Sequence, residues 1–220
     1  MPGRHDTSNP QKSKAPPRRT QAARTEAMRA KLSEAAYRIV AEGGVRALTI
    51  RALATAANVS QGAVLHHFPD KNAIVLLAIE QTLTLAREDS HRWLDNPGDA
   101  EGVLRSMLAE FRAFFFSDRF WVAMGITIEA SKDTELFPAV RATVAALRAP
   151  VYRAWADRLV EQGWNIDLAH RDVRAAAGMI SGAAVRRFWA DEDNVSHAVE
   201  EEWITACLAT HRNRLSLRIP

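Results

Sequence analysis

The chain has 220 residues, 47% of them apolar and 25% charged, with 29 Lys and Arg against 26 Asp and Glu, near the average usage of globular proteins. A chain of this length buries enough surface to fold without a disulfide or a metal, and its single cysteine excludes an intramolecular disulfide and any multi-cysteine metal site. Because no apolar run reaches transmembrane length and residues 1–24 lack an apolar core, we expect neither a membrane partner nor a secretory leader, and hence a cytoplasmic protein.

Positive charge is concentrated at the amino-terminal end. Residues 1–24 hold six basic residues against one acidic residue and almost no large apolar side chain. Such a segment buries too little apolar surface to offset the entropy of ordering, so we expect a disordered basic arm over 1–24. The arm either follows the phosphates or the minor groove of a nucleic acid, or has no partner.

The first predicted helix covers residues 25–42. Leu32, Ala36 and Val40 recur in it with a helical period, which predicts an amphipathic helix with one buried face. The helix is expected to end at Gly43-Gly44, since glycine is the usual residue past a helix end.

Two short helices are predicted next. Thr49 is placed to cap the first of them, and Ser60 is placed to cap the second, over 61–67. Between them lies Asn58, a residue type that tolerates the left-handed backbone of a sharp turn. Two short helices joined in this way, after a helix that braces them, are typical of a helix-turn-helix.

The rest of the chain also shows the helical period and no alternating strand pattern. We therefore predict an all-α protein with nine or ten helices in total. Pro150 is expected to kink or divide the helix that contains it. Asp167 and Ser196 are expected to cap the last two helices. The predicted helices lie at about 71–93, 100–117, 118–131, 133–163, 167–189 and from 196 onward.

The second short helix is the candidate recognition helix. Gln61, Gly62 and Ala63 stand at its start and are small or polar, so its backbone can approach base edges closely in a major groove. Val64 and Phe68 are expected to face inward and to anchor it. Arg51 and Gln61 have the length and the hydrogen-bonding groups to contact base edges.

Here the chain resembles the DNA-binding domain of the tetracycline-repressor (TetR) family. The resemblance rests on the segments 48–54, 58–64 and 66–71, which couple a helix-turn-helix to His-His-Phe and a following Lys, and it covers residues 25–75. It implies an all-α homodimer whose amino-terminal heads bind a palindromic operator of double-stranded DNA. It also implies a carboxy-terminal core that binds a small molecule, and this molecule releases the DNA.

The resemblance also implies roles for single residues. Thr49 and Ser60 would cap helices and contact phosphate, and Arg51, Gln61 and Ala63 would face bases. The family usually has aromatic residues where this chain has Leu65 and His66, and leucine can contact a thymine methyl group. The expected DNA-binding set is Thr49, Arg51, Ser60, Gln61, Gly62, Ala63, Leu65, His66, His67 and Lys71, the last three of these on the phosphate backbone.

A metal site is the alternative explanation for the pair His66-His67. Adjacent residues on a helix point about 100° apart and form a poor chelate, and no Cys or acidic partner is near in sequence. We therefore predict no metal and no cofactor, and a DNA-contacting or packing role for the two histidines.

An aromatic-rich stretch around residues 107–128 predicts a pocket for a small hydrophobic or aromatic ligand, with ordinary core packing as the alternative. Three consecutive Phe residues, 114–116, cannot share one helix face, so part of the stretch belongs to the core. A cation held by aromatic faces beside Glu129 is a second ligand chemistry that the stretch allows. The candidate pocket residues are Trp93, Met107, Phe111, Phe114, Phe115, Trp121, Met124, Ile128, Phe137, Tyr152 and Trp155.

Small residues on the predicted helix 167–189 form a face that allows close helix approach. The approach is either to a helix of the same chain or to a second copy, and the TetR resemblance implies a four-helix bundle between two subunits. Cys207 is expected to be a packed small hydrophobe rather than a redox switch. The candidate dimer-interface residues are Gly178, Gly182, Val185, Val199, Trp203 and Cys207.

The sequence therefore predicts a ligand-responsive DNA-binding regulator, most simply a repressor, with an arm at 1–24, a DNA-binding domain at 25–70 and an effector and dimerisation domain at 71–220. One alternative is a DNA-binding protein whose carboxy-terminal domain only dimerises. The other is an all-α enzyme, which the sequence argues against because it has no phosphate loop, nucleophile elbow, paired-carboxylate site or metal motif.

Overall fold

A computed structural model describes residues 21–95, 98–190 and 193–216. This part of the chain is all-α, as predicted, with nine α-helices and one short 3-10 helix. The elements are α1 (Gln21–Gly43), η1 (Val45–Ala47), α2 (Ile50–Ala56), α3 (Gln61–His67), α4 (Lys71–His91), α5 (Ala100–Phe115), α6 (Asp118–Ala130), α7 (Leu136–Glu161), α8 (Ile166–Arg186) and α9 (Asp193–Ser216).

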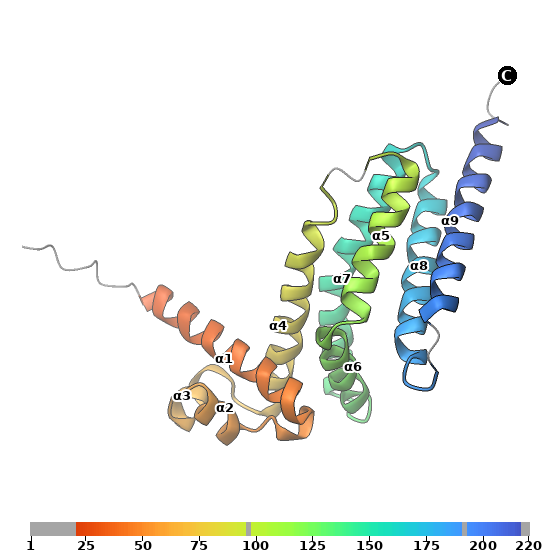
Figure 1. The fold of residues 1–220 in the computed structure, drawn as a ribbon. Coiled ribbons are helices and arrows are strands. Elements are labelled where there is room, and N and C mark those ends of the chain that lie inside the picture. The colour runs from red at the N-terminus through yellow and green to blue at the C-terminus, as the bar shows by residue number, and fades with distance from the viewer. Residues whose placement is uncertain (1–20, 96–97, 191–192, 217–220) are drawn as a thin grey trace, which may run out of the picture.

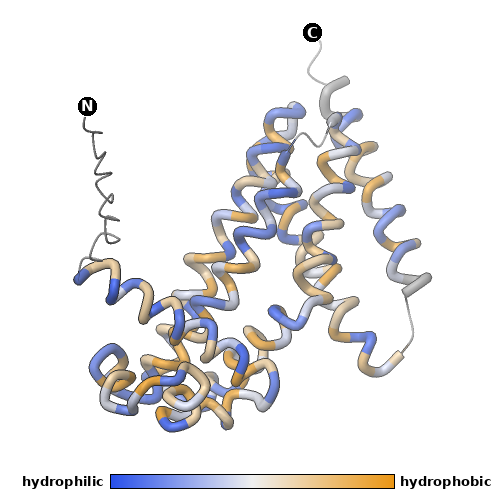
Figure 2. The backbone as a smooth tube through the Cα atoms, turned by 60° about the vertical axis from the view of Figure 1, so that its left-hand side comes forward, coloured by the Kyte–Doolittle hydropathy of each residue, from blue (hydrophilic) through white to orange (hydrophobic). Residues whose placement is uncertain are grey.

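The helices form a small head and a larger helical core. Helices α1, α2 and α3 make the head, while α5, α7, α8 and α9 lie side by side in the core, with α6 at the end of the core nearer the head (Figure 1). Helix α4 belongs to both parts, because it packs against α1 and also against α7. Apolar and polar residues alternate along the helices of both parts (Figure 2), as amphipathic helices require.

Each of the three helices of the head contributes at least one fully buried apolar side chain to its core. Leu32 of α1, Leu53 of α2 and Val64 of α3 are fully buried. Local caps fix where the helices begin: the Thr49 hydroxyl accepts from the Ala52 N–H at 3.1 Å, and the Ser60 hydroxyl accepts from the Ala63 N–H at 3.1 Å. Both predicted caps of the helix-turn-helix are therefore confirmed.

The first helix is longer than predicted. It begins at Gln21 instead of Thr25, so the last four residues of the segment that we expected to be disordered are helical. Ala22 and Ala23 explain the difference, since alanine has the highest helix propensity and the first turn extends an existing helix without a new nucleus. The rest of the expected arm, residues 1–20, lies outside the described residues.

Pro150 does not divide its helix. Helix α7 continues from Leu136 to Glu161 through Pro150, which lies on the exposed face. The missing N–H therefore costs one hydrogen bond, while Val151 and Trp155 on the buried face keep the helix packed against the core. Helix α7 also begins at Leu136, slightly later than the predicted start at about residue 133, because the Asp133 carboxylate lies before the helix and accepts the N–H of Leu136 at 2.9 Å.

The caps of the last two helices were wrongly predicted. Asn165, not Asp167, caps α8, and its side-chain oxygen accepts the N–H groups of Asp167 and Leu168. Helix α9 begins at Asp193, so Ser196 lies inside it, where its hydroxyl accepts a hydrogen bond from Arg112 at 3.2 Å. Because Arg112 of α5 binds the Ser196 hydroxyl, this serine is accommodated inside the helix, and its position in the sequence does not mark a helix start.

No helix in the described part of the chain is both long enough and apolar enough to cross a membrane.

Candidate nucleic-acid interface and effector cavity

The turn between α2 and α3 has the predicted conformation. Asn58 adopts a left-handed backbone with φ of 48°, and it is the only non-glycine residue with positive φ among the described residues. The Val59 N–H, one residue later, donates to the Ala54 carbonyl at 2.9 Å. This turn sets the angle between the two helices and so determines which face of α3 stays in solvent.

Helix α3 has a buried face and an exposed face. Val64 is fully buried, and Phe68, directly after the helix, is 5% exposed and lies under the Arg29 guanidinium. On the other face Gln61 and His66 are exposed, and Leu65 keeps 43% of its surface. The polar Gln61 side chain suits hydrogen bonding to base edges, and the exposed Leu65 suits contact with a thymine methyl group.

Gly62 leaves the start of α3 open. A methyl group at its Cα position would meet only the Ser60 hydroxyl, at 3.9 Å. Packing within the described part of the chain therefore does not require glycine at this position. The absence of a side chain here lets another molecule approach the first turn of α3 closely.

The remaining predicted contacts surround this helix. Thr49, Arg51 and Lys71 are exposed at the starts of α2 and α4. His66 is exposed, whereas His67 is half-buried and lies against Phe68, with 6.3 Å between the ring centres. The structure therefore brings the expected set together around one helix, but gives His67 a packing contact.

The two histidines have no further metal-binding partners nearby. Their rings meet edge to face, with 5.3 Å between centres. Within the described residues, no group of three or more His, Cys, Asp and Glu side chains is placed to hold a metal ion.

The aromatic residues predicted for one pocket divide between the core and two separate cavities. Met107, Phe111 and Trp155 are fully buried packing residues, and Ile128 is 56% exposed on α6. Trp121 and Phe137 are half-buried, and Trp121 meets Phe188 at 4.7 Å between ring centres. Glu129 faces basic side chains: it pairs with Lys132 at 2.8 Å and lies 3.8 Å from Arg46. Its pKa is lowered mainly by the hydrogen bond from Lys132.

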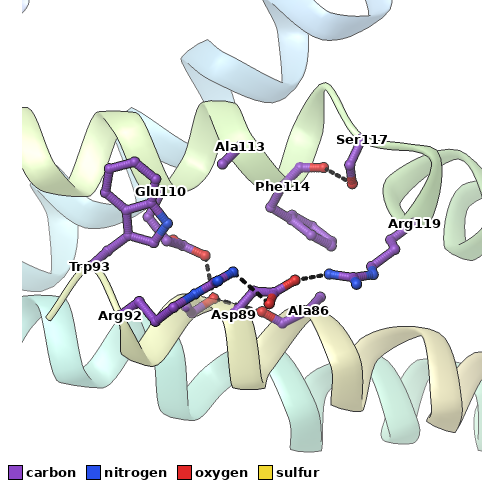
Figure 3. A pocket seen from close by; sticks show the side chains of 10 residues that line it. Ala86, Asp89, Arg92, Trp93, Glu110, Ala113, Phe114, Ser117 and Arg119 are labelled. Atoms are coloured by element: carbon purple, nitrogen blue, oxygen red, sulfur yellow. Dashed lines mark hydrogen bonds and ion pairs between the residues drawn. The ribbon is translucent and has the colours of Figure 1, made fainter.

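The first of these two cavities, here called the inner cavity, has a volume of about 140 Å³. It lies between the carboxyl end of α4, helix α5 and the start of α6 (Figure 3). Trp93 and Phe114, both predicted, supply aromatic walls, and the remaining lining residues are Ala86, Asp89, Ser90, Arg92, Glu110, Ala113, Ser117 and Arg119.

Polar groups of the inner cavity tie α4 to the other two helices. The Ser90 hydroxyl of α4 donates to the Glu110 carboxylate of α5, and Arg119 of α6 forms an ion pair with Asp89 of α4. Sequence reasoning missed these residues. One feature of the sequence could have indicated this polar site: Glu110 is a charged residue between Met107 and Phe114 on the apolar face of α5, where it is 2% exposed.

The second cavity, here called the α8 groove, is wide and open, with a volume of about 640 Å³. Phe115, Met124 and Tyr152 of the predicted pocket lie on one side of it. Three predicted interface residues of α8 lie on the other side: Gly178, Gly182 and Val185.

The candidate interface residues of α9 differ in exposure. Val199 is 43% exposed and Trp203 is half-buried, whereas Cys207 is only 8% exposed. Cys207 therefore packs within its own chain as a small buried side chain, and its place in an interface stays a prediction. Burial, followed by the charge of Asp172, raises the pKa of the Cys207 thiol to about 12.

Comparisons with known proteins point to one family. Residues 32–78 match the family model described as bacterial regulatory proteins, tetR family. The HTH-type transcriptional regulator CymR of Pseudomonas putida is 31% identical over 175 residues, which is 80% of this chain and 86% of that protein.

Solved structures share the fold. A TetR-family regulator from Mesorhizobium loti superposes with a TM-score of 0.66 at 14% identity, over 85% of this chain and 98% of that one. The regulator FadR of Bacillus subtilis, solved with stearoyl-CoA, superposes with a TM-score of 0.56 at 14% identity, over 80% of this chain and 97% of that one.

Proposed function

The chain belongs to the TetR family of bacterial regulatory proteins and is a DNA-binding transcriptional regulator, not an enzyme. From this premise we propose that it acts as a dimeric repressor, which a small ligand with hydrophobic or aromatic groups releases from a palindromic operator. The proposed division of labour assigns DNA binding to residues 25–70, effector binding and dimerisation to 71–220, and additional phosphate contacts to the basic residues of 1–24.

The observation that carries the proposal is the exposed face of α3. Val64 and Phe68 hold the helix to the head, while Gln61, Gly62 and Leu65 are left in solvent on a helix slim enough for a major groove. In this proposal Gln61 and Arg51 contact base edges. Thr49, Ser60, His66 and Lys71 bind phosphates and set the position of the head on the duplex.

A second copy of the chain is the proposed occupant of the open surface on α8. Added methyl groups at Gly178 and Gly182 would find no atom within 4 Å, so contacts within the described part of the chain do not account for these glycines. Glycines at such positions let another helix approach closely. Pairing of α8 and α9 between two subunits builds a four-helix bundle and places two heads on one DNA.

Helix α4 is the proposed link between ligand and DNA. Its first residue, Lys71, lies beside α3, and its carboxyl end supplies Asp89 and Ser90 to the inner cavity. A ligand that moves this end changes the separation of the two heads. Because successive major grooves have a fixed spacing, a changed separation costs affinity for the operator. The related fold of FadR, solved with stearoyl-CoA, supports a ligand-binding role for the core.

The test is selection of bound sequences from a random DNA pool, followed by screening of small ligands against the complex. The proposal expects a palindromic consensus and a class of small ligands that weakens binding to it. Enrichment of no sequence would contradict DNA readout by α3. A palindrome that no ligand releases would favour a regulator whose core only dimerises.

A further inference from the structure

Arg29 of α1 connects α4 with the end of α3. Its guanidinium donates a hydrogen bond to the Glu80 carboxylate of α4, with 2.8 Å between Nη2 and Oε2. The same guanidinium lies over the Phe68 ring, with 5.7 Å between its central carbon and the ring centre, which is within the range of a cation–π contact. One side chain therefore contacts both α4 and the residue that follows α3.

Helix α3 is attached to the rest of the head mainly on one side. Among the described elements it packs chiefly against α2. Phe68 closes the helix, because its N–H donates to the Val64 carbonyl at 2.8 Å and its side chain is 5% exposed. The position of the Phe68 ring therefore helps to set the orientation of α3, and with it the direction in which Gln61 and Leu65 point.

Glu80 brings the position of α4 to this contact. It directly follows Ile79, which is fully buried, so the backbone that carries its carboxylate is held in the core. Helix α4 packs against α1 in the head and against α7 in the helical core. The ion pair and the cation–π contact of Arg29 thus connect α4 with the exposed surface of α3 through a single guanidinium.

A direct phosphate contact is the alternative role for an arginine in a DNA-binding head. The side chains of Arg29 and Glu80 are 47% and 51% exposed, so another molecule can reach the guanidinium. Its charge, however, already has the Glu80 carboxylate as a counter-charge, and one of its donors points to that carboxylate. Because the carboxylate repels phosphates, the pair is poorly suited to bind the DNA backbone.

We propose that Arg29 is a positioning residue for the recognition helix: it holds Phe68, and through it α3, in the orientation that Glu80 of α4 sets. This inference rests on the proposed role of α3 and adds to it a residue that does not touch DNA. Loss of the guanidinium lets α3 tilt on the head. Base contacts depend on this orientation more than phosphate contacts do, because hydrogen bonds to base edges require a fixed geometry.

The experiment measures the affinity of the full chain for the selected palindrome and for an unrelated duplex, by fluorescence anisotropy over a series of salt concentrations. Arg29→Met should weaken operator binding about three- to tenfold and binding to unrelated DNA less than about twofold. The slope of log affinity against log salt should stay at the wild-type value, since no phosphate contact is lost. A slope shallower by roughly 0.9, with equal losses on both duplexes, would show a phosphate contact and overturn the proposal.

Glu80→Gln separates positioning from simple charge by the sign of its effect. The substitution removes a negative charge, which on charge alone strengthens binding to every DNA. Positioning predicts the opposite for the operator, a weakening of about two- to fivefold. Glu34→Gln, exposed on α1, makes the same change of charge and is the matched control, which should not weaken operator binding. Tighter operator binding by Glu80→Gln would contradict the positioning role.

Two further variants test whether both residues act through one contact. Arg29→Lys keeps a cation that can pair with Glu80 and should recover most of the affinity that Arg29→Met loses. The double variant Arg29→Met with Glu80→Gln should bind the operator no more weakly than Arg29→Met alone, and additive losses would overturn the proposal. Partial unfolding would lower the affinity for both duplexes equally, so the ratio of the two affinities measures positioning independently of stability.

Gln61→Ala, measured on the same two duplexes, separates this inference from the proposed function. If Gln61→Ala loses the preference for the operator while Arg29→Met keeps it, α3 reads the operator and the positioning role of Arg29 is wrong. If Gln61→Ala keeps the preference, the proposed role of α3 is wrong and the inference built on it fails with it.

Discussion

Nearby side chains of α3 lie in opposite environments, one in solvent and one in the core of the head. Gln61 is exposed at the first turn, and Val64, three residues later, is fully buried on the face of α3 turned away from solvent. Substitution of the exposed residue therefore changes the surface without opening a cavity, whereas substitution of Val64 would do so. This separation lets DNA binding be tested independently of folding.

The first prediction compares a base contact with a phosphate contact. Gln61→Ala should lose about 1–3 kcal/mol of binding to the selected operator and much less to unrelated DNA, because a hydrogen bond to a base edge carries the discrimination. Lys71→Ala should weaken both about equally, because phosphate contacts are independent of sequence. Fluorescence anisotropy with labelled duplexes measures both losses at one salt concentration.

Both variants should melt at the wild-type temperature, since both side chains are exposed. The assignment of α3 as the recognition helix would be wrong if Lys71→Ala changed the preferred sequence while Gln61→Ala left it intact.

The second prediction concerns Cys207. Burial raises its thiol pKa to about 12, above the ordinary value of about 8.5. At pH 8 the folded protein should therefore react with a thiol reagent on the order of a thousandfold more slowly than the urea-unfolded protein, because the thiolate is the reacting form. Since folding disfavours the thiolate, stability should fall as pH rises from about 9 towards 12. Rapid labelling of the folded protein would contradict the burial of this side chain.

At the scale of single elements, α8 carries the surface proposed for the second subunit. Its small residues have open space around them, so the free chain should tolerate larger side chains there. This makes α8 a sensitive place to test for a partner, because a loss of association can be separated from a loss of fold.

The third prediction is that Gly182→Glu breaks the dimer without unfolding the subunit. A glutamate there would bring a charge and added bulk into a close contact between two subunits and cost several kcal/mol, roughly 3–5. Light scattering should show half the wild-type mass, with an unchanged circular dichroism spectrum. Ala146→Glu, on the exposed face of α7, is the control and should remain dimeric. A dimeric Gly182→Glu protein would remove α8 from the interface.

The fourth prediction concerns the turn that orients α3. At φ of 48° a β-branched side chain is strained, so Asn58→Val should lower stability by about 1–2 kcal/mol. Asn58→Gly should stay close to wild type, because glycine adopts this backbone freely. Thermal melting measures both changes. Equal melting temperatures for the two variants would mean that the turn relaxes to another conformation.

Local signals predicted the head well and the core poorly. Thr49 and Ser60 cap helices by binding an N–H three residues later, and Asn58 shapes a turn through its own backbone angle. These roles depend only on nearby residues, so they could be derived from the sequence alone. The effect of Pro150 depends on which face of α7 packs against the core, and the role of Ser196 depends on Arg112 of another helix. Neither can be inferred from the neighbouring sequence.

The inner cavity escaped prediction for the same reason. The aromatic residues around 107–128 were recognised as a group, but packing buries some of them and exposes others. The polar groups that distinguish the inner cavity, Ser90, Glu110 and Arg119, come from three different helices. Only the folded chain brings them together.

At the scale of the whole molecule, α4 is the physical connection between head and core. Arg29 of α1 pairs with Glu80 of α4 at 2.8 Å, and Arg119 of α6 pairs with Asp89 at the other end of α4. Apolar packing is continuous along the same helix, from Ile74 to Ala86. In the proposed mechanism, a displacement at the inner cavity would reach the DNA-binding head through this one helix, which is the coupling that a ligand-responsive regulator needs.

The central claim is that two copies of α3 bind one operator at a fixed separation. The most direct measurement compares affinity for the selected palindrome with affinity for the same palindrome after insertion of about five base pairs, half a helical turn, at its centre. The account predicts that the insertion weakens binding on the order of a hundredfold, because only one head then reaches its groove. Equal affinity for the two duplexes would contradict it, since the heads would then bind independently of each other.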